Sequence, residues 1–261
     1  MRNQRRIMFI DNKHKLIWDF QKEIVEIYKS RDLINLSGLD REFILNGRNI
    51  LQWYFETIGN IKTKPSNFDF NRCFEDLMFC SDEIIYFTAL LYLYRPYLQN
   101  PIKDGYQFGD KMVYPYIQTI EVSRFNMFVN TLYEKIYNYW DRIGDLFGAF
   151  LPKLNPKRIY FTTVIDYMEG DFEDSENYMW LNKFRKNEFK ELNQQRNDVV
   201  HYELVGTKFR WGHVKNVTDE KRISDMVNER EKLPEYFKTH NDLTKIGFEK
   251  SIQLLTEFIE K

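Results

Sequence analysis

The sequence predicts an all-α protein. Apolar residues recur at steps of three and four along most of the chain, the spacing that puts side chains on one face of a helix. Glycine and proline are sparse, with 11 and 7 among 261 residues, so few turns are available for a β architecture. Hydrophobic residues make up 43% and aromatic residues 17%, enough for a core of long helices with bulky seams.

The first hundred residues are expected to form an N-terminal helical region. Amphipathic spacing predicts one helix from Lys15 to about Ser30 and a second from Asp40 to Gly59, whose first half Gly47 weakens. A third, mostly buried helix is predicted from Asn71 to Tyr94, where Arg95-Pro96 ends it.

Two segments have the composition of loops. One runs from Asn60 to Phe70, and the other runs from Pro96 to Pro115 with Gly105 and Gly109 inside it. The second loop is the best candidate boundary between a region of residues 1–100 and a helical bundle of residues 117–261.

The strongest amphipathic pattern predicts a long helix from Ile117 to Leu151. Its apolar stripe is broad, and Pro152 and Pro156 would terminate it. The polar side of this helix carries the following residues: Glu134, Asn138, Asp141 and Arg142. In a bundle, that side can lie against another polar helix.

The next two segments are less decided. Residues 158–167 are β-branched and aromatic enough for a strand, but no partner strand is evident, so a helix stays open. Asp166 to Glu176 holds six acidic residues and no basic one. We interpret it as a solvated acidic loop, because the calcium-binding pattern with its central glycine is missing.

A helix from Asn177 to Tyr202 carries the densest group of reactive side chains. Arg196 offers a forked cation suited to phosphate oxygens, and His201 is of the one residue type that exchanges protons near neutral pH. Five residues on a helix place these two about 140° apart. Asn197 and His201, at i and i+4, share a face, and the long Arg196 side chain can swing toward the same groove.

After this helix, residues 205–217 are predicted to be irregular. A highly charged helix is expected from Asp219 to Leu233, before Pro234, and a closing helix from Asp242 to Ile259.

The charge pattern points to a local site for nucleic acid. The net charge of −1 gives no overall field, but residues 180–215 hold eight bases against four acids. Phe209 and Trp211 interleave with these bases as stacking surfaces for unpaired nucleotides. The candidate RNA-binding residues are Lys183, Arg185, Lys208 and Arg210.

Several other classes of site are disfavoured. Cys73 and Cys80 are seven residues apart, too far on one helix for a disulfide, and suit a reducing cytoplasm. The longest apolar stretch, residues 84–94, is too short for a membrane helix. The other histidines have no partner at zinc-ligand spacing, and no glycine-rich phosphate loop appears. Glu188-Phe189-Lys190 has the E-x-K order of metal-dependent nucleases but lies in helical sequence. We therefore expect no metal and no cofactor.

Arg196-Asn197, three further residues and His201 resemble the R-x(4–6)-H signature of HEPN domains. The resemblance covers residue 117 to the C-terminus. Within the family, the chain is similar to an uncharacterised bacterial subgroup with a comparable long helix before the motif. It implies an antiparallel helical bundle that dimerises. In ribonuclease members two such motifs meet across the dimer and cut RNA without metal, so the resemblance assigns catalysis to Arg196, Asn197 and His201.

The same resemblance suggests supporting residues. A polar side chain of the long helix is expected beside the motif, and Asp141 is our choice, with Asp198 and Tyr202 from the motif itself. The Tyr202 hydroxyl either bonds the phosphate or packs the next turn.

Two functions stay open at this stage. The first is a metal-independent endoribonuclease, acting as a homodimer on RNA, with a toxin or defence role among the uses of such enzymes. The second is a non-catalytic HEPN-like module that dimerises and binds a nucleotide, an RNA or a partner protein. The sequence does not identify an antitoxin or any other protein partner.

Overall fold

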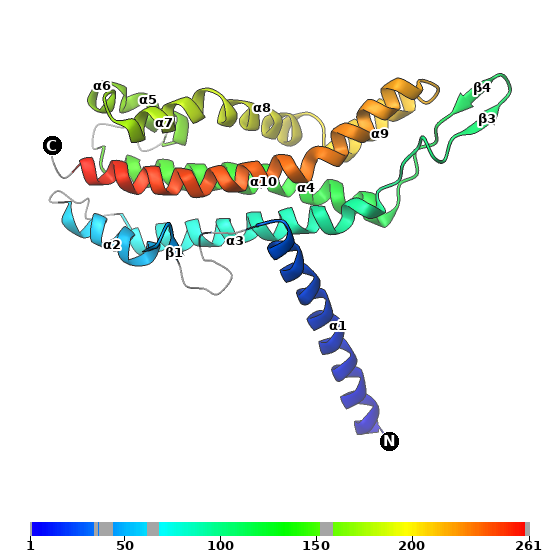
Figure 1. Ribbon diagram of the computed structural model, residues 1–261, viewed down its shortest axis with the longest axis horizontal. Coiled ribbons are helices and arrows are strands. Elements are labelled where there is room, and N and C mark those ends of the chain that lie inside the picture. Colours follow the sequence, from blue (N-terminus) through cyan, green and yellow to red (C-terminus); the bar gives the residue numbers. More distant parts are fainter. Residues whose placement is uncertain (1, 34–35, 37–43, 62–67, 152–158, 259–261) are drawn as a thin grey trace.

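Three long helices form the spine of the structure. They are α3 (Phe70–Tyr94), α4 (Ile120–Gly148) and α10 (Glu220–Glu257). In the computed structural model, which describes residues 2–33, 36, 44–61, 68–151 and 159–258, α3 runs antiparallel to the other two (Figure 1). The predicted all-α, HEPN-like helical fold is confirmed.

Helix α4 is the centre of the core. It begins at Ile120 because the Thr119 hydroxyl accepts a hydrogen bond from the Val122 backbone N–H at 3.2 Å. Its buried residues recur at three and four residue steps around Trp140, which is fully buried. The Trp140 ring lies 4.1 Å from the Phe184 ring and 4.9 Å from the Phe161 ring, measured between centroids. Each such side chain contributes roughly 1.5–3 kcal/mol through burial.

A second layer of shorter helices covers the face of α4 and α10 that is opposite α3 (Figure 1). Its members follow one another along the chain: α5 (Phe161–Tyr167), α6 (Glu169–Phe172), α7 (Glu176–Lys186), α8 (Glu188–His201) and α9 (Val205–Lys215). Because α8 packs on α4, the residues of the motif are held against the central helix.

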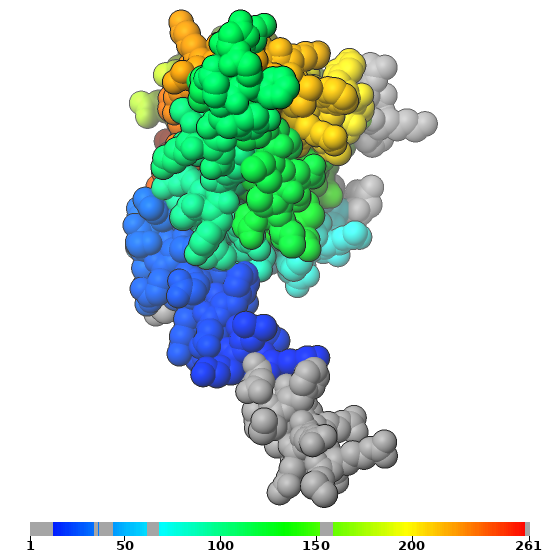
Figure 2. All heavy atoms as spheres, turned by 90° about the vertical axis from the view of Figure 1, so that its right-hand side faces the viewer, coloured from blue at the N-terminus to red at the C-terminus, as the bar shows by residue number. Residues whose placement is uncertain are grey.

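Helix α1 (Arg2–Ser30) extends away from the body of the protein (Figures 1 and 2). The C-terminal part of α1 packs on α3, and the side chain of Ile24 is buried there. Nearer its start, Leu16, Ile17 and Trp18 are exposed. The predicted helix of residues 15–30 is therefore present and begins earlier than expected.

We predicted too early a start for the second helix. Residues 44–49 form a small hairpin of β1 (Ile44–Leu45) and β2 (Arg48–Asn49), and α2 (Ile50–Asn60) follows. Asn46 and Gly47 both have a positive φ, the backbone that a tight hairpin turn requires. Residues 40–43, like most of the predicted loop of residues 60–70, lie outside the described residues.

The tyrosine-rich loop of residues 96–115 also contains a hairpin. A 3₁₀ turn (Arg95–Tyr97) follows α3, and β3 (Tyr106–Phe108) pairs with β4 (Lys111–Val113) around Gly109, whose φ is 61°. This hairpin points away from the end of the bundle (Figure 1). The division into residues 1–100 and 117–261 stays a prediction, and α3 from the first part packs along α4 from the second.

The strand alternative for residues 158–167 is wrong. Phe161, Val164 and Ile165 are fully buried, and their spacing of three and four fits one face of α5. The acidic segment that follows is not all loop, since residues 169–172 form the short helix α6. The two terminating prolines predicted at residues 152 and 156 lie outside the described residues.

The helix predicted from Asn177 to Tyr202 is interrupted. Asn187, with φ −113° and ψ −90°, separates α7 from α8, and its side-chain amide donates to the Lys183 carbonyl at 2.9 Å. Asparagine competes for backbone hydrogen bonds in this way, so the break has a local cause. Residues 205–215, predicted to be irregular, instead form α9, which buries Val205 and Phe209.

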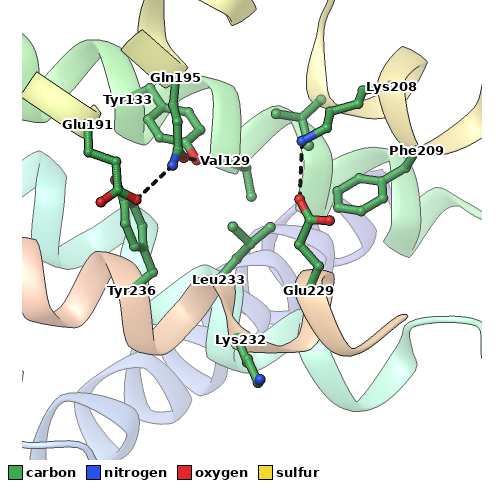
Figure 3. Close-up of a pocket in the computed structure, with 11 residues that line it drawn as sticks. Val129, Tyr133, Glu191, Gln195, Lys208, Phe209, Glu229, Lys232, Leu233 and Tyr236 are labelled. Atoms are coloured by element: carbon green, nitrogen blue, oxygen red, sulfur yellow. Dashed lines mark hydrogen bonds and ion pairs between the residues drawn. The ribbon is translucent and has the colours of Figure 1, made fainter. Parts of the chain in front are cut away.

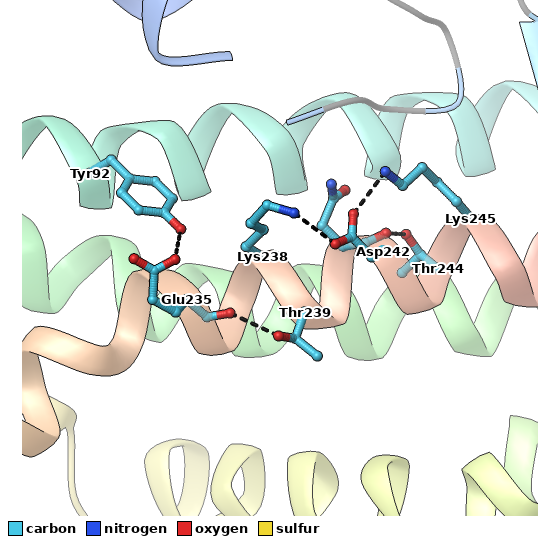
Figure 4. Close-up of polar contacts among 8 residues, drawn as sticks. Tyr92, Glu235, Lys238, Thr239, Asp242, Thr244 and Lys245 are labelled. Carbon is cyan, nitrogen blue, oxygen red and sulfur yellow. Dashed lines mark hydrogen bonds and ion pairs between the residues drawn. The ribbon is translucent and has the colours of Figure 1, made fainter. Parts of the chain in front are cut away.

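Pro234 does not end a helix. Helix α10 continues through it as one helix of 38 residues, and the axis bends between its first third and the remainder (Figure 1). Beyond the bend, one polar contact links α10 to α3 and others form along α10 itself (Figure 4). The Tyr92 hydroxyl of α3 donates to Glu235, and Asp242 accepts from Lys238 at 2.9 Å and Lys245 at 2.8 Å.

Residues 70–97 are long and apolar enough to cross a membrane by length and composition alone. That segment is α3 with its 3₁₀ turn, and 56% of its most apolar window is buried inside the protein. The core helix of a soluble protein passes the same test, so this is weak evidence for a membrane span.

Gly247 of α10 is the point of closest approach to Trp140. A Cβ added at Gly247 would overlap the Trp140 ring, whereas a Cβ added at Gly59 of α2 would meet nothing within 4 Å. We expect Gly247→Ala to lower the free energy of unfolding by about 1–3 kcal/mol, through overpacking. Gly59→Ala, the control, should be neutral or stabilise by up to about 1 kcal/mol in urea unfolding. Equal effects of the two changes would contradict this packing.

Candidate functional site

The site is built on the second half of α8. Phe189 and Leu192 are buried against the core and fix which face of α8 meets α4. On an ideal helix, Arg196 follows Leu192 by one turn on that same face. Burial of this face therefore directs Arg196 toward α4.

Arg196 makes three contacts there. One guanidinium nitrogen, Nη2, lies 3.3 Å from Glu134 Oε2, and Nη1 donates to Asn197 Oδ1 at 3.2 Å. The guanidinium carbon lies 4.6 Å from the centre of the Tyr137 ring, a cation–π distance. The Arg196 side chain is 21% exposed and that of Glu134 is 36% exposed. The cation is thus positioned and partly neutralised by α4.

Glu134 and Tyr137 are the partners of Arg196 that we did not select from the sequence. They lie three residues apart on α4, and Asp141 follows Tyr137 by four, so the three share one face. The Tyr137 ring also stacks on Phe189 at 5.8 Å between centroids. The signal was present, because Glu134 was already placed on the polar side of the long helix.

Asp141, our predicted supporting residue, lies one turn beyond this contact. It accepts a hydrogen bond from the Phe161 backbone N–H at 3.4 Å and lies beside the Tyr137 hydroxyl. Burial raises the pKa of Asp141 to about 6 and, with Asp141 as a second cause, raises the pKa of Tyr137 to about 12. Glu134, and not Asp141, is the carboxylate paired with Arg196.

The remaining residues of the motif lie at the open end of α8. His201 is the last helical residue and is exposed, as is Asp198. Tyr202 caps the helix, its N–H donating to the Asp198 carbonyl at 3.0 Å, and its side chain is 84% exposed. Within the described residues, no hydrogen bond holds the His201 ring, whose nearest aromatic contact is Tyr202 at 6.5 Å between centroids.

One chain therefore does not aim Arg196 and His201 at the same point. The first faces α4 and the second faces solvent, as the separation of about 140° on a helix requires. Asn197 lies between them, since it touches Arg196 and is one turn from His201 on the same face.

The four predicted RNA-binding residues do not form one patch. Lys183 and Arg185 lie on α7 and the others on α9, at opposite ends of α8 (Figure 1). Arg185 is paired with Asp166, and burial lowers its pKa. Lys208 is paired with Glu229 at 3.1 Å. Arg210 is exposed, with its guanidinium 6.0 Å from the Trp211 ring centre.

A cavity of about 310 Å³ opens on the other flank of α8, between α4, α9 and α10 (Figure 3). The Tyr133 hydroxyl donates to Gln195, whose amide donates to Glu191 at 3.1 Å. Burial raises the pKa of Tyr133 above its ordinary range, with Glu229 and Glu191 adding to the effect. Glu191 and Glu229 line the cavity together with Lys208 and Lys232, so acidic and basic side chains balance there.

The described residues contain no group of three or more His, Cys, Asp or Glu side chains that could hold a metal ion. His213 is buried and bonds the Tyr114 carbonyl at 2.7 Å, and His240 is buried beside the Tyr236 ring.

Comparison with known families gives one result. The family model described as Cthe2314-like HEPN matches residues 92–261, which is more than half of the chain. No curated protein and no solved structure matches.

The raised pKa of Asp141 predicts a pH-dependent stability. The Asp141 carboxyl holds its proton more tightly in the folded protein than in the unfolded chain. Its contribution to the free energy of unfolding is therefore full below pH about 4 and is lost as the pH rises through about 6. Asp141→Asn should therefore raise the free energy of unfolding at pH 8 by about 1 kcal/mol, after allowance for solvent screening. The gain should shrink toward pH 4 in urea unfolding. The exposed Asp174→Asn is the control, and an equal gain there would exclude burial as the cause.

Proposed function

Because the chain belongs to the Cthe2314-like HEPN family, we propose that it is a metal-independent endoribonuclease that works as a homodimer in the cytoplasm. The observation that carries this proposal is the arrangement of α8. Arg196 is fixed by Glu134 and Tyr137, while His201 projects from the exposed end of the same helix. A positioned cation and an accessible imidazole are the two groups that phosphodiester transfer needs.

The proposed reaction is attack by the ribose 2′-hydroxyl. His201 removes the proton as the 2′-oxygen bonds to phosphorus, and the bond from phosphorus to the 5′-oxygen breaks. The imidazolium of His201 that forms in this way then gives its proton to the leaving 5′-oxygen. The products carry 2′,3′-cyclic phosphate and 5′-hydroxyl ends. Arg196 stabilises charge on the phosphorane oxygens, and Asn197, which already contacts Arg196, orients it.

The need for a second copy follows from the same geometry. Arg196 and His201 of one chain point in directions about 140° apart on α8. A second copy that places its His201 at the edge of the contact between α4 and α8 would bring that imidazole to Arg196, whose side chain is 21% exposed there. Exposed Val200, Tyr202 and Leu204 provide apolar surface for such a contact next to the motif.

One observation favours the alternative of a non-catalytic module. The Arg196 cation already has Glu134 as an ion-pair partner and Tyr137 as a ring partner. A guanidinium engaged in this way can serve as a structural link between α4 and α8, leaving the exposed end of α8 to bind a nucleotide, an RNA or a partner protein.

The first test is cleavage of a labelled mixed-sequence RNA in EDTA. We expect His201→Ala to lower the cleavage rate by about 10²- to 10⁴-fold, because general acid–base catalysis is lost, and Arg196→Ala to lower it by at least about 10²-fold. His14→Ala on α1 and Arg72→Ala on α3 are the matched controls, since both residues are exposed in other parts of the structure. They should cleave as the parent does.

The product ends decide the mechanism. Cyclic phosphate termini in the presence of EDTA support 2′-hydroxyl attack without metal. Cleavage that appears only with added divalent metal would rule it out, and no cleavage by a folded dimer would favour the binding module.

A composite site makes a second prediction, about mixed dimers. Arg196→Ala and His201→Ala chains, each inactive alone, should regain part of the parental rate when mixed, because a mixed dimer retains one arginine and one histidine across the interface. Light scattering should give twice the mass of one chain for the parent and both variants. A fully active monomer would contradict the composite site.

A further inference from the structure

A groove lies between the start of α4 and α9, at the end of the bundle seen in Figure 2. One part has a volume of about 330 Å³, and a second part of about 340 Å³ adjoins it. Both parts share Tyr116, Gln118 and Arg210, so they form one continuous surface.

The polar side chains of the groove are mainly amides and hydroxyls with one permanent cation, and apolar side chains such as Met127, Leu204 and Val214 lie beside them. Gln118, Asn126 and Asn130 supply amides, Ser123 and Thr207 supply hydroxyls, and Arg210 supplies the charge. No carboxylate lines either part, in contrast to the cavity that Glu191 and Glu229 line. Amide and guanidinium groups are the side chains that read base edges and bind phosphates.

Asn126 is built into the groove. It is only 6% exposed, and among the described residues its Oδ1 atom is buried and accepts no hydrogen bond. Gly206 of α9 faces it, and a Cβ at Gly206 would lie 3.2 Å from Asn126 Nδ2. A buried acceptor without a donor is costly, and a ligand N–H can relieve that cost when the Asn126 amide turns toward the groove.

Arg210 is free to bind an anion. It is exposed, and no carboxylate of the described part of the chain lies within ion-pair distance of it. The half-exposed Trp211 ring beside it provides a stacking surface.

The groove continues from the end of the motif. Leu204, which lines it, follows His201 by three residues, and the Val205 N–H at the start of α9 donates to Asn130 Oδ1 at 3.2 Å. A strand of RNA with a phosphate at His201 therefore reaches the groove within its next nucleotides.

We propose that this groove binds one unpaired nucleotide of single-stranded RNA, with an exocyclic amine of the base donating to Asn126 Oδ1 and Arg210 holding the adjacent phosphate. This deepens the ribonuclease proposed above and rests on it. Adenine, cytosine and guanine carry such an amine. Uracil offers only one N–H between two carbonyl oxygens, which face Asn126 Oδ1 with like charge.

The test measures binding separately from cleavage. Labelled eight-nucleotide oligo(A), oligo(C) and oligo(U) RNAs are titrated into the full chain carrying His201→Ala, with fluorescence anisotropy as the readout. We expect oligo(A) and oligo(C) to bind about tenfold or more tighter than oligo(U), the discrimination that one good base contact supplies.

Three further substitutions on this background locate the contact. Asn126→Leu keeps the branched shape and should reduce the preference to about threefold or less, because the acceptor is lost. Gly206→Ala, which crowds Asn126 from α9, should also reduce the preference. It replaces Asn126→Leu in the test if a thermal melt shows that Asn126→Leu is unfolded. Arg210→Ala should lower the affinity for all three RNAs alike and reduce the salt dependence of that affinity by about one phosphate contact. Arg72→Ala should change neither.

The outcomes separate the two proposals. A base preference lost in the Asn126 or Gly206 variants supports the groove, even if the parent cleaves no RNA. Parental affinity and preference in folded Asn126 and Arg210 variants would overturn the groove, even if the parent cleaves RNA. Equal binding of all three RNAs by the His201→Ala chain would overturn it as well.

Discussion

The close packing of α10 on α4 at Gly247 and Trp140 is the contact on which the arrangement depends. Because Gly247 has no side chain, α10 can approach the edge of the Trp140 ring closely, and the same ring packs against Phe161 and Phe184. One tryptophan thereby joins α10, α5 and α7 to the central helix. The position of α8, and so the direction of Arg196, follows from this joint, since α8 continues from α7 after one break at Asn187.

The helical fold and its long central helix could be predicted from spacing alone, but the ends and breaks of several helices could not. Pro234 argued for two helices, yet the contacts of α10 with α3 and α4 outweigh one lost hydrogen bond and one bend. Asn187 ended a helix without any proline or glycine. Residues 158–167 have strand-like composition, and burial of one helical face decided their structure. At Pro234 and in residues 158–167 tertiary packing overrode a local preference, whereas the break at Asn187 has a local cause.

The candidate site, too, could be predicted from the sequence only in part. The motif of Arg196, Asn197 and His201 is local in sequence, so its pattern was visible, and the family it indicated is confirmed by the match over residues 92–261. Glu134 and Tyr137 lie about sixty residues earlier, and choosing them over Asp141 needed the rotation of α4 about its axis. The groove could not be predicted from the sequence. One of its sides is α9, and residues 205–215 were predicted to be irregular.

The late position of α10 along the chain also has a consequence for biosynthesis. As the protein leaves the ribosome, α3 and α4 can pair soon after α4 emerges, because they are neighbours in sequence and antiparallel. The contact between Trp140 and Gly247 then forms only after more than seventy further residues have been translated and α10 arrives. During that interval the side of α4 that α10 will cover is exposed to solvent. The core that supports the proposed site is therefore completed only after α10 has left the ribosome.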